Sequence, residues 1–294
     1  MFQKLKLTFY GRKSCLQLGL VYLFLIAAGV AGDDPVYNLA EYLYKQGNYQ
    51  AAIIEYNRYL FFHPDADQTD TIYFKMGQAC NSEEQYEKAI MYLDKAALGA
   101  KEARDRDSYR IEQSLILMKN ENYDLAKLKL LKLIHFSEYD FIRKKAEYFL
   151  GLCFAMQYNW NESLIHFRNY FSKINPASYV ALDSLYRLHD SFSYKSPSSA
   201  KWLSTFIPGS GQIYAEDFRN GFNALAVNFS FGYLIVYGLA KGQILDVLII
   251  YATLFERYYS GNRYHAEETA REYNLKLDKK FHKMVTEFLY QQVE

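Results

Sequence analysis

An aromatic residue recurs every 37 residues in the first half of the chain, and this spacing constrains the fold more than any other feature. A small residue follows each aromatic by three positions, a large apolar residue follows it by seven, and a small residue precedes it by nine. The positions are, in order, Ala40, Tyr49, Ala52 and Tyr56; Gly77, Tyr86, Ala89 and Leu93; Ser114, Tyr123, Ala126 and Leu130; and Gly151, Trp160, Ser163 and Phe167. Self-similarity at a fixed period is the signature of stacked repeats.

The spacing within each set predicts a helix–turn–helix unit. Residues at i, i+3 and i+7 share one face of a helix, so the aromatic, the small residue and the large residue point the same way. The earlier small residue would let the partner helix approach closely. Polar turns separate the two helices at 46–48, 83–85, 120–122 and 157–159. We therefore predict an all-α solenoid of four repeats over residues 33–174.

The pattern resembles the tetratricopeptide repeat over about 35–172. The matching residues are Gly47, Tyr49, Ala52, Tyr56 and Pro64 in the first unit, and Gly77, Tyr86, Ala89 and Ala96 in the second. Two departures stand out. The period is 37 rather than the ~34 of the family, which implies longer loops. The third unit carries Gln113, Ser114 and Lys127 where apolar or small residues are usual.

The resemblance implies a concave groove that can hold a peptide or a helix of another protein. We expect exposed residues of the first helices, such as Tyr42, Lys75 and Gln78, to line this groove. Cys80 and Cys153 fall in predicted helices two repeats apart, too distant for a disulfide, and are expected to be buried free thiols.

Residues 1–32 have the organisation of an export signal. Lys4, Lys6, Arg12 and Lys13 supply a positive start, residues 16–28 form an apolar core, and the small–x–small sequence at 29–31 fits a cleavage site. The apolar core is shorter than the ~20 residues that a spanning helix needs. An uncleaved N-terminal anchor is the alternative interpretation.

Residues 175–200 are predicted to form a capping helix and a linker. The helix, from Asn175 to about Ser191, has no second half and fits a cap on the open end of the array. The following stretch, 193–199, is rich in Ser and contains Pro197, which predicts a linker.

The composition changes after residue 200. An apolar run at 221–240 contains Asn223, Asn228 and Ser230, a polar turn follows at 241–243, and a second apolar run at 244–255 carries Asp246. The first run is long enough to span a ~30 Å hydrocarbon core. We predict a membrane-associated helical hairpin over 201–262 and an amphipathic C-terminal helix over 263–294. A buried hairpin in a soluble helical domain is the alternative.

The segment that leads into the hairpin resembles a known motif. The sequence 208–214 reads P-G-S-G-Q-I-Y and is similar to the P-G-x-G-Q-x-Y hallmark of certain two-transmembrane modules, which also tend to carry a later Gly-Asn pair, here Gly261-Asn262. Where a glycine often follows the Tyr, this chain has residues 215–217, Ala-Glu-Asp. The resemblance covers roughly 204–274 and implies a bacterial envelope location without implying a reaction. We interpret the motif as a membrane-entry turn formed by Pro208, Gly209, Gly211, Gln212 and Tyr214.

No catalytic or metal site is predicted. The histidines form no i, i+4 pair. Ser210 lacks the G-x-S-x-G frame of a nucleophile elbow, and the segment lacks the lysine of a phosphate loop. A formal net charge of +1 gives no indication of a nucleic-acid partner. No cofactor is expected.

The leading hypothesis is therefore a non-enzymatic, membrane-tethered scaffold for protein–protein interaction in the bacterial cell envelope. Its repeats would face the periplasm, and its partners would be envelope proteins and membrane lipid. The alternative is a membrane-embedded enzyme or transport component that gathers Asn223, Asn228 and Asp246 around one site. Asp246 would otherwise lie near the membrane surface, one turn from the loop. A third possibility is a subunit for envelope biogenesis with no ligand of its own.

Overall fold

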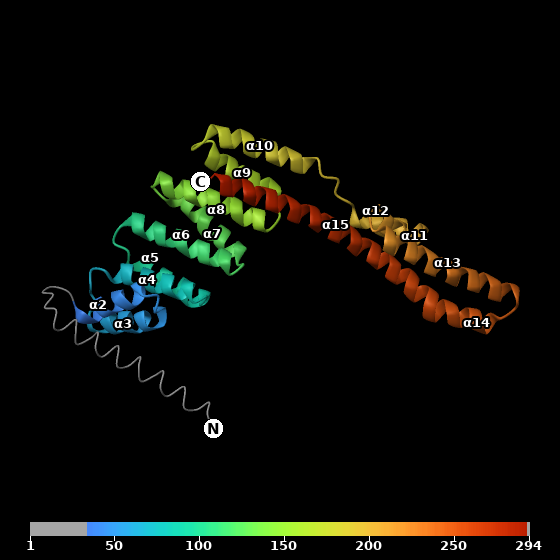
Figure 1. The fold of residues 1–294 in the computed structure, drawn as a ribbon, viewed down its shortest axis with the longest axis horizontal. Helices are drawn as coiled ribbons and strands as arrows, with labels where there is room; N and C mark the ends of the chain where they lie inside the picture. The colour runs from blue at the N-terminus through green and yellow to red at the C-terminus, as the bar shows by residue number, and fades with distance from the viewer. Residues whose placement is uncertain (1–33, 293–294) are drawn as a thin grey trace, which may run out of the picture. The chain divides into compact units, whose positions relative to one another are not determined.

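The computed structural model describes residues 34–292, which form two compact units that divide between Lys173 and Ile174. The regular elements of these residues are all helical, which confirms the predicted all-α class (Figure 1). The segment predicted to be an export signal lies outside the described residues.

The first unit consists of four consecutive helix pairs in which each helix packs against the next. Their bounds are α2 (Pro35–Lys45), α3 (Tyr49–Phe62), α4 (Thr69–Ser82), α5 (Tyr86–Gly99), α6 (Ala103–Lys119), α7 (Tyr123–Phe136), α8 (Asp140–Met156) and α9 (Trp160–Phe171). In each pair, the recurrent aromatic residue is the first residue of the second helix. The repeat solenoid predicted from the 37-residue spacing is therefore present.

Glycines at two repeat positions hold the helices of a pair in close contact. A Cβ atom added to Gly77 would lie 2.9 Å from Leu93 Cγ, and one added to Gly151 would lie 2.8 Å from Phe167 Cδ1. Leu93 and Phe167 are fully buried. Close-packed interiors cannot absorb even one added carbon without displacement, so the small residue in each first helix is fixed by the large residue opposite it.

The four turns within the pairs share one conformation. Gly47, Glu84, Glu121 and Tyr158 all have φ between 56° and 75°. In each turn the next residue's N–H donates to a carbonyl five residues earlier, with donor–acceptor distances of 2.8–2.9 Å. This is the Schellman closure of a helix end. The left-handed conformation costs a residue other than glycine roughly 1 kcal/mol, so packing of the two helices stabilises the turn at three of the four sites.

The 37-residue period predicts longer loops, but most of the extra length of the repeat does not lie in loops. Only the connection at 63–68, between α3 and α4, is long, and the connections at 100–102 and 137–139 have three residues each. Instead, the first helices of the third and fourth pairs have 17 residues, against 14 in α4.

The second unit contains the helices predicted for the hairpin together with two flanking helices. Their bounds are α10 (Pro176–Asp190), α11 (Pro197–Phe206), α12 (Ser210–Tyr214), α13 (Phe218–Ala240), α14 (Ile244–Ile249), the π-helical segment η1 (Ile250–Phe255) and α15 (Glu256–Gln291). Helix α13 and the arm that starts with α14 are antiparallel, joined at residues 241–243 (Figure 1).

Three predicted features of this region differ in the structure. Helix α10, predicted to cap the repeats, belongs to the second unit and packs on α15, where the Tyr186 and Phe281 rings lie 5.1 Å apart. The predicted linker is shorter, because Ser196 caps a helix that starts at Pro197; the Ser196 hydroxyl accepts a hydrogen bond from the Ser199 N–H. Proline is favourable at the first position of a helix, so the Ser-Pro pair starts a helix here.

The third difference concerns the predicted boundary between residues 262 and 263. Helical structure runs without interruption through α14, η1 and α15, so the second arm of the hairpin and the C-terminal amphipathic segment form one continuous element. The change in composition near this point marks a change of surroundings along one helix, and it does not mark a turn.

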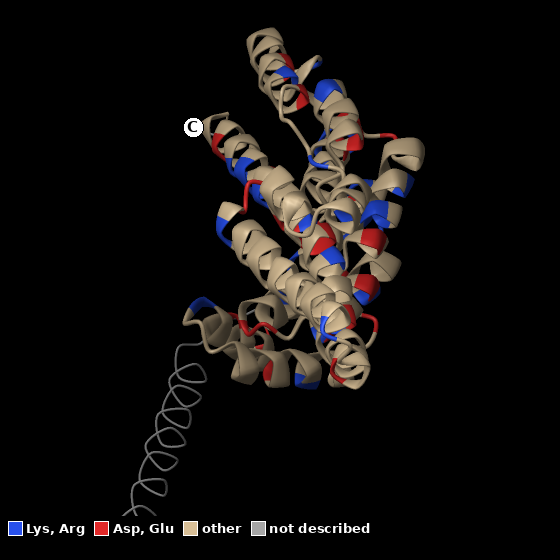
Figure 2. Ribbon diagram, turned by 90° about the vertical axis from the view of Figure 1, so that its right-hand side faces the viewer, with Lys and Arg blue, Asp and Glu red and all other residues tan. Residues whose placement is uncertain are grey.

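Helix α13 is the one helix among residues 34–292 that is long and apolar enough to cross a membrane. Only 11% of its apolar window is buried. Between Arg219 and Glu256 the charged residues are Lys241 and Asp246. Elsewhere, acidic and basic residues are mixed along the helices (Figure 2). The hairpin therefore exposes large apolar side chains along a stretch that carries only two charged residues.

The close contact at Gly151 gives a direct test of repeat packing. We expect Gly151→Ala to lower the free energy of unfolding by about 1–3 kcal/mol, because the added carbon would have to displace a buried ring. Gly99→Ala is the matched control: its added carbon meets nothing closer than 3.7 Å and the site is exposed, so stability should be unchanged or slightly higher. Urea unfolding of the full chain in mild detergent, followed by circular dichroism, measures both. Equal stability of the two variants would contradict this account of the repeat.

Candidate functional site

The first helices of the repeats share a face that carries a small hollow. Residues of α4, α6 and α8 line this hollow, which has a volume of about 110 Å³. The Phe74 and Tyr109 rings stack with their centroids 4.8 Å apart, and Ile111 and Ile142 complete the apolar part. Glu112 and Lys145 supply the charged part of the lining, and Ser108 also contacts it. The hollow is thus an apolar depression bordered by one acid and one base.

Two of the three residues predicted to line the groove are engaged within the repeats. Lys75 forms an ion pair with Glu41, and the Tyr44 hydroxyl donates to the Gln78 side-chain oxygen at 3.0 Å. Burial opposes ionisation of Glu41, but hydrogen bonds from Lys75 and Tyr56 outweigh it and hold the pKa of Glu41 below its ordinary value. These contacts join α2 to α4. Tyr42 remains exposed.

The predicted free thiols are confirmed. Cys80 and Cys153 are unpaired and buried. Burial raises the pKa of the Cys153 thiol to about 12. Since the thiolate is the reactive form, Cys153 is an inert part of the repeat core.

In the second unit, the motif at 208–214 forms a tight connection between α11 and α13. Gly209 has φ +92°, and a Cβ there would lie 2.0 Å from the Gly221 carbonyl oxygen. A Cβ on Gly211 would lie 2.0 Å from the Ala200 carbonyl oxygen and 2.7 Å from Ala266 Cβ. Contacts this short with backbone atoms cannot be relieved by a side-chain rotation. Both glycines are therefore required for the approach of the helices.

A buried hydrogen-bond network surrounds these glycines. The Gln212 amide nitrogen donates to Asn262 Oδ1 at 2.9 Å, and Gln212 Oε1 accepts from the Ser204 hydroxyl at 3.0 Å. The Gly209 N–H also donates to Asn262 Oδ1, at 3.1 Å. In return, the Asn262 amide nitrogen donates to the Ser204 carbonyl at 3.2 Å. Each buried amide thus has partners for both its donor and its acceptor, as a stable core requires.

The network assigns a structural role to the motif. The Tyr214 hydroxyl accepts from the Ser196 N–H at 3.1 Å, which ties the end of the motif to the start of α11. The Ser210 hydroxyl donates to the Ile207 carbonyl at 2.7 Å, so it is held by the backbone rather than by a base. Sequence reasoning identified the motif and the Gly261-Asn262 pair by resemblance. It did not identify Ser204, or the fact that Asn262 bonds to the motif across 50 residues.

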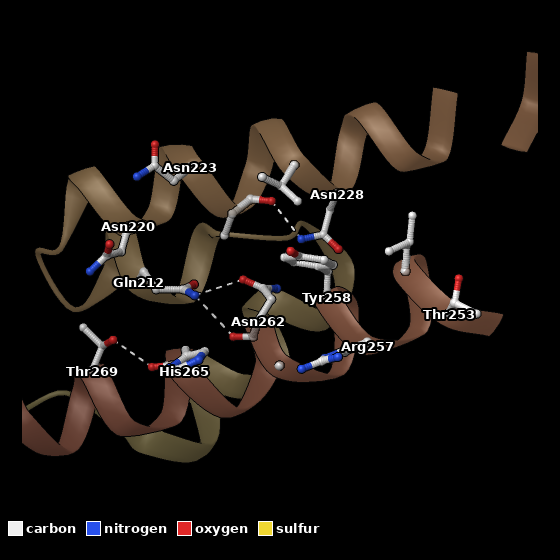
Figure 3. A pocket seen from close by; sticks show the side chains of 14 residues that line it. Gln212, Asn220, Asn223, Asn228, Thr253, Arg257, Tyr258, Asn262, His265 and Thr269 are labelled. Carbon is white, nitrogen blue, oxygen red and sulfur yellow. Dashed lines mark hydrogen bonds between the residues drawn. The ribbon is translucent and has the colours of Figure 1, made fainter. Parts of the chain in front are cut away.

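A larger cavity of about 800 Å³ lies between α13 and the arm formed by η1 and α15 (Figure 3). Asn223 and Asn228 line it, but Asp246 does not. Asp246 is exposed in the first turn of α14, near the loop. The structure therefore brings together two of the three polar residues that the alternative function requires.

The rest of the cavity lining is rich in hydrogen-bonding side chains. Those that sequence reasoning did not assign to a site are Asn220, Thr253, Arg257, Tyr258, His265 and Thr269. Asn220 comes from α13 and the others from the η1–α15 arm, where Thr253, Arg257, His265 and Thr269 are spaced by multiples of four residues. The two segments are more than 30 residues apart in sequence, so no local pattern shows that they share one cavity. The lining contains no acidic residue. Within residues 34–292, no cluster of His, Cys, Asp or Glu could hold a metal ion.

Asn228 is the most unusual residue of this lining. It is 4% exposed, and its amide nitrogen donates to the Ala224 carbonyl at 2.8 Å. Its side-chain oxygen, however, has no hydrogen-bond partner. A buried acceptor without a donor costs about 1–3 kcal/mol. Facing it, η1 is a π-helical segment, a form that is rare and frequent at functional sites.

Comparisons with known proteins add little beyond these observations. No protein-family model and no curated protein match the chain. Among solved structures, the chain is similar to YrrB, described as a TPR protein with an unusual peptide-binding site. The two share 18% identity over 70% of this chain and 89% of that one, with a TM-score of 0.39. At that level of similarity the fold assignment rests on the helices themselves.

The buried network makes a specific prediction for Gln212. Replacing it with Met keeps its approximate size but removes donors and acceptors that Ser204 and Asn262 use. We expect Gln212→Met to destabilise the second unit by about 2–4 kcal/mol, measured by thermal unfolding in detergent. Gln243→Met, an exposed position in the hairpin turn, should change stability by less than about 0.5 kcal/mol. If the two variants unfold alike, the network does not hold the helices together.

Proposed function

We propose that this protein is a membrane-tethered scaffold of the bacterial cell envelope, which binds a peptide or helix of a partner protein on the first-helix face of its repeats. The observation that carries the proposal is the apolar hollow of α4, α6 and α8. Its volume of about 110 Å³ is well below the ~300–1,000 Å³ typical of small-molecule sites. A hollow of this size suits one anchoring side chain of a protein partner.

The surroundings of the hollow support a peptide rather than a flat protein surface as the ligand. Phe74 and Tyr109 supply a rigid aromatic wall, and such residues dominate interface energetics. Glu112 and Lys145 can fix the direction of a bound segment through charge. The ion pair of Lys75 with Glu41 stiffens the neighbouring helices, so the face needs little reordering on binding.

The tether is assigned to the hairpin. Large apolar side chains along α13 and α14 are mostly exposed, among them Phe229 at 75%, Val236 at 66% and Leu245 at 77%. The core helix of a soluble domain would bury these groups, and a lipid environment removes the cost of exposing them to water. Fixing the repeats at a membrane raises their effective concentration near other envelope proteins.

A photo-crosslinking residue placed at Ser108 tests the partner site. We expect it to capture one or a few defined envelope proteins, and the same residue at Glu87, exposed on a second helix, should not capture them. Adding Lys145→Glu to the Ser108 probe should strongly reduce the adduct, because it reverses the charge of the exposed base that borders the hollow. Equal capture from Ser108 and Glu87, or an adduct that is unchanged by Lys145→Glu, would refute binding at this face.

Alkaline carbonate extraction tests the tether. We expect the full-length protein to remain in the membrane pellet, because exposed apolar helices leave the bilayer only at a large free-energy cost. A variant with Phe229→Lys and Val236→Lys should move substantially to the soluble fraction, whereas Phe61→Lys, on an exposed second helix of the repeats, should not. Release of the unaltered protein would place the hairpin in a soluble domain.

A further inference from the structure

The cavity between α13 and the η1–α15 arm combines a positive charge with many neutral hydrogen-bonding groups. Arg257 and His265 lie on one wall, Asn223 and Asn228 on the other, and Tyr258 projects between them (Figure 3). Within residues 34–292, no hydrogen bond, ion pair or ring contact engages Arg257. With no carboxylate in the lining, this guanidinium is available to an anion from outside the chain.

Asn228 adds a second requirement for the ligand. Asn228 lines the cavity, and its side-chain oxygen is buried and lacks a donor. A polar group in this situation calls for an explanation, and a ligand that donates a hydrogen bond supplies one. The ligand therefore carries an anionic group for Arg257 and a hydroxyl or ammonium group for Asn228.

An apolar groove adjoins the same asparagine on its other side. It has a volume of about 560 Å³, and its lining includes Phe206, Leu225, Phe229, Gly232 and Phe255 together with Asn228. A Cβ on Gly232 would meet no atom within 4 Å, so the groove is open at its middle. The groove can take a hydrocarbon chain while the polar cavity holds the charged end of the same molecule.

The position of the cavity along the hairpin agrees with this division. At 1.5 Å per helical residue, Asn228 lies roughly 20 Å and Asn223 roughly 27 Å from the turn residue Lys241. Arg257 lies roughly 21 Å from Gln243, the last residue of this turn, along the other arm. A hydrocarbon core is ~30 Å thick, so Asn223 reaches the level of one layer of lipid head groups, and Asn228, which the apolar groove shares, lies deeper together with Arg257.

We propose that this cavity binds the head group of a glycerophospholipid. The phosphate contacts Arg257, the hydroxyl or ammonium group of the head group donates to Asn228 Oδ1, and an acyl chain lies in the apolar groove. The proposal rests on the membrane tether of the proposed function and is independent of what the repeats bind. The hairpin then recognises a particular lipid as well as anchoring the protein in the membrane.

The test uses the full-length protein, delipidated in mild detergent, and short-chain probes that dissolve as monomers. Dihexanoyl phosphatidylethanolamine and dihexanoyl phosphatidylglycerol supply the phosphate with an ammonium or hydroxyl donor. Dihexanoylglycerol lacks the phosphate, and inorganic phosphate lacks the chains. We expect at least one phospholipid to bind at least about 10-fold more tightly than either partial probe. Inorganic phosphate binding as tightly as the phospholipids would identify a soluble ligand, and equal binding of dihexanoylglycerol would identify a purely apolar site; both overturn the proposal.

Variants assign the two contacts. Arg257→Gln should weaken phospholipid binding about 10-fold or more, since a charge-assisted hydrogen bond is lost. Arg219→Gln, an exposed arginine of α13 outside the cavity, should change it by less than about twofold. If both arginines matter equally, binding reflects general surface charge and the site is refuted.

Asn228→Leu separates a ligand contact from a structural role. Since the asparagine oxygen is unpaired in the protein alone, the leucine variant should unfold at the same temperature or higher while its phospholipid affinity falls. A lower unfolding temperature with unchanged affinity would show that the amide serves the fold. Both readouts are independent of the crosslinking test on the repeats, so either proposal can fail alone.

Discussion

The close approach of two helices at a residue that has no room for a larger side chain is the constraint on which both units depend. In the repeats it appears where Gly77 faces Leu93 and where Gly151 faces Phe167. In the second unit it is tighter, because Gly209 and Gly211 face backbone carbonyls. Where side chain meets side chain, packing density sets the cost of an added carbon. Where Cβ would meet backbone, the contact decides whether the helices can pack at all. The glycines of the C-terminal motif are therefore more restrictive than those of the repeats.

The same type of turn joins helices in both units. The hairpin entry at 215–217 and the hairpin tip at 241–243 repeat the turn found inside every repeat, with a positive φ at Glu216 and Gly242 and a hydrogen bond back to the carbonyl five residues earlier. The entry turn keeps the spacing of the repeats as well: Phe218 follows it, Gly221 lies three residues later, and Gly209 lies nine residues earlier. The same local structure, a helix closed by a left-handed residue and followed at once by the next helix, thus occurs both in the repeats and in the apolar hairpin.

This shared geometry explains what the sequence could and could not predict. Repeat helices were predictable because each pair is closed locally, and the aromatic residue after the turn marks the start of the second helix. The start of α11 was misjudged because Ser196-Pro197 can end one element or cap the next, and the buried contact of Ala200 decides between them. The continuity of the second arm was missed because polarity changes along it without a helix breaker.

The motif was recognised by resemblance, whereas its bonds to Ser204 and Asn262 depend on contacts between distant helices. The lining of the cavity was not predictable for the same reason: Asn228 and Arg257 become neighbours only when the hairpin closes.

Two asparagines of the second unit show how similar side chains take different roles. Asn262 and Asn228 are almost equally buried, at 5% and 4% exposed. The Asn262 side chain accepts two hydrogen bonds and donates one, so both ends of its amide have partners within the fold. Asn228 donates one and leaves its oxygen unpaired beside a cavity large enough for a ligand. A leucine would remove that unpaired acceptor and would suit an apolar helix better, so packing gives no reason for the amide. Its placement has a physical reason if a donor enters the cavity from outside the chain, and in our proposal Arg257 on the opposite helix would contact the phosphate of the same molecule.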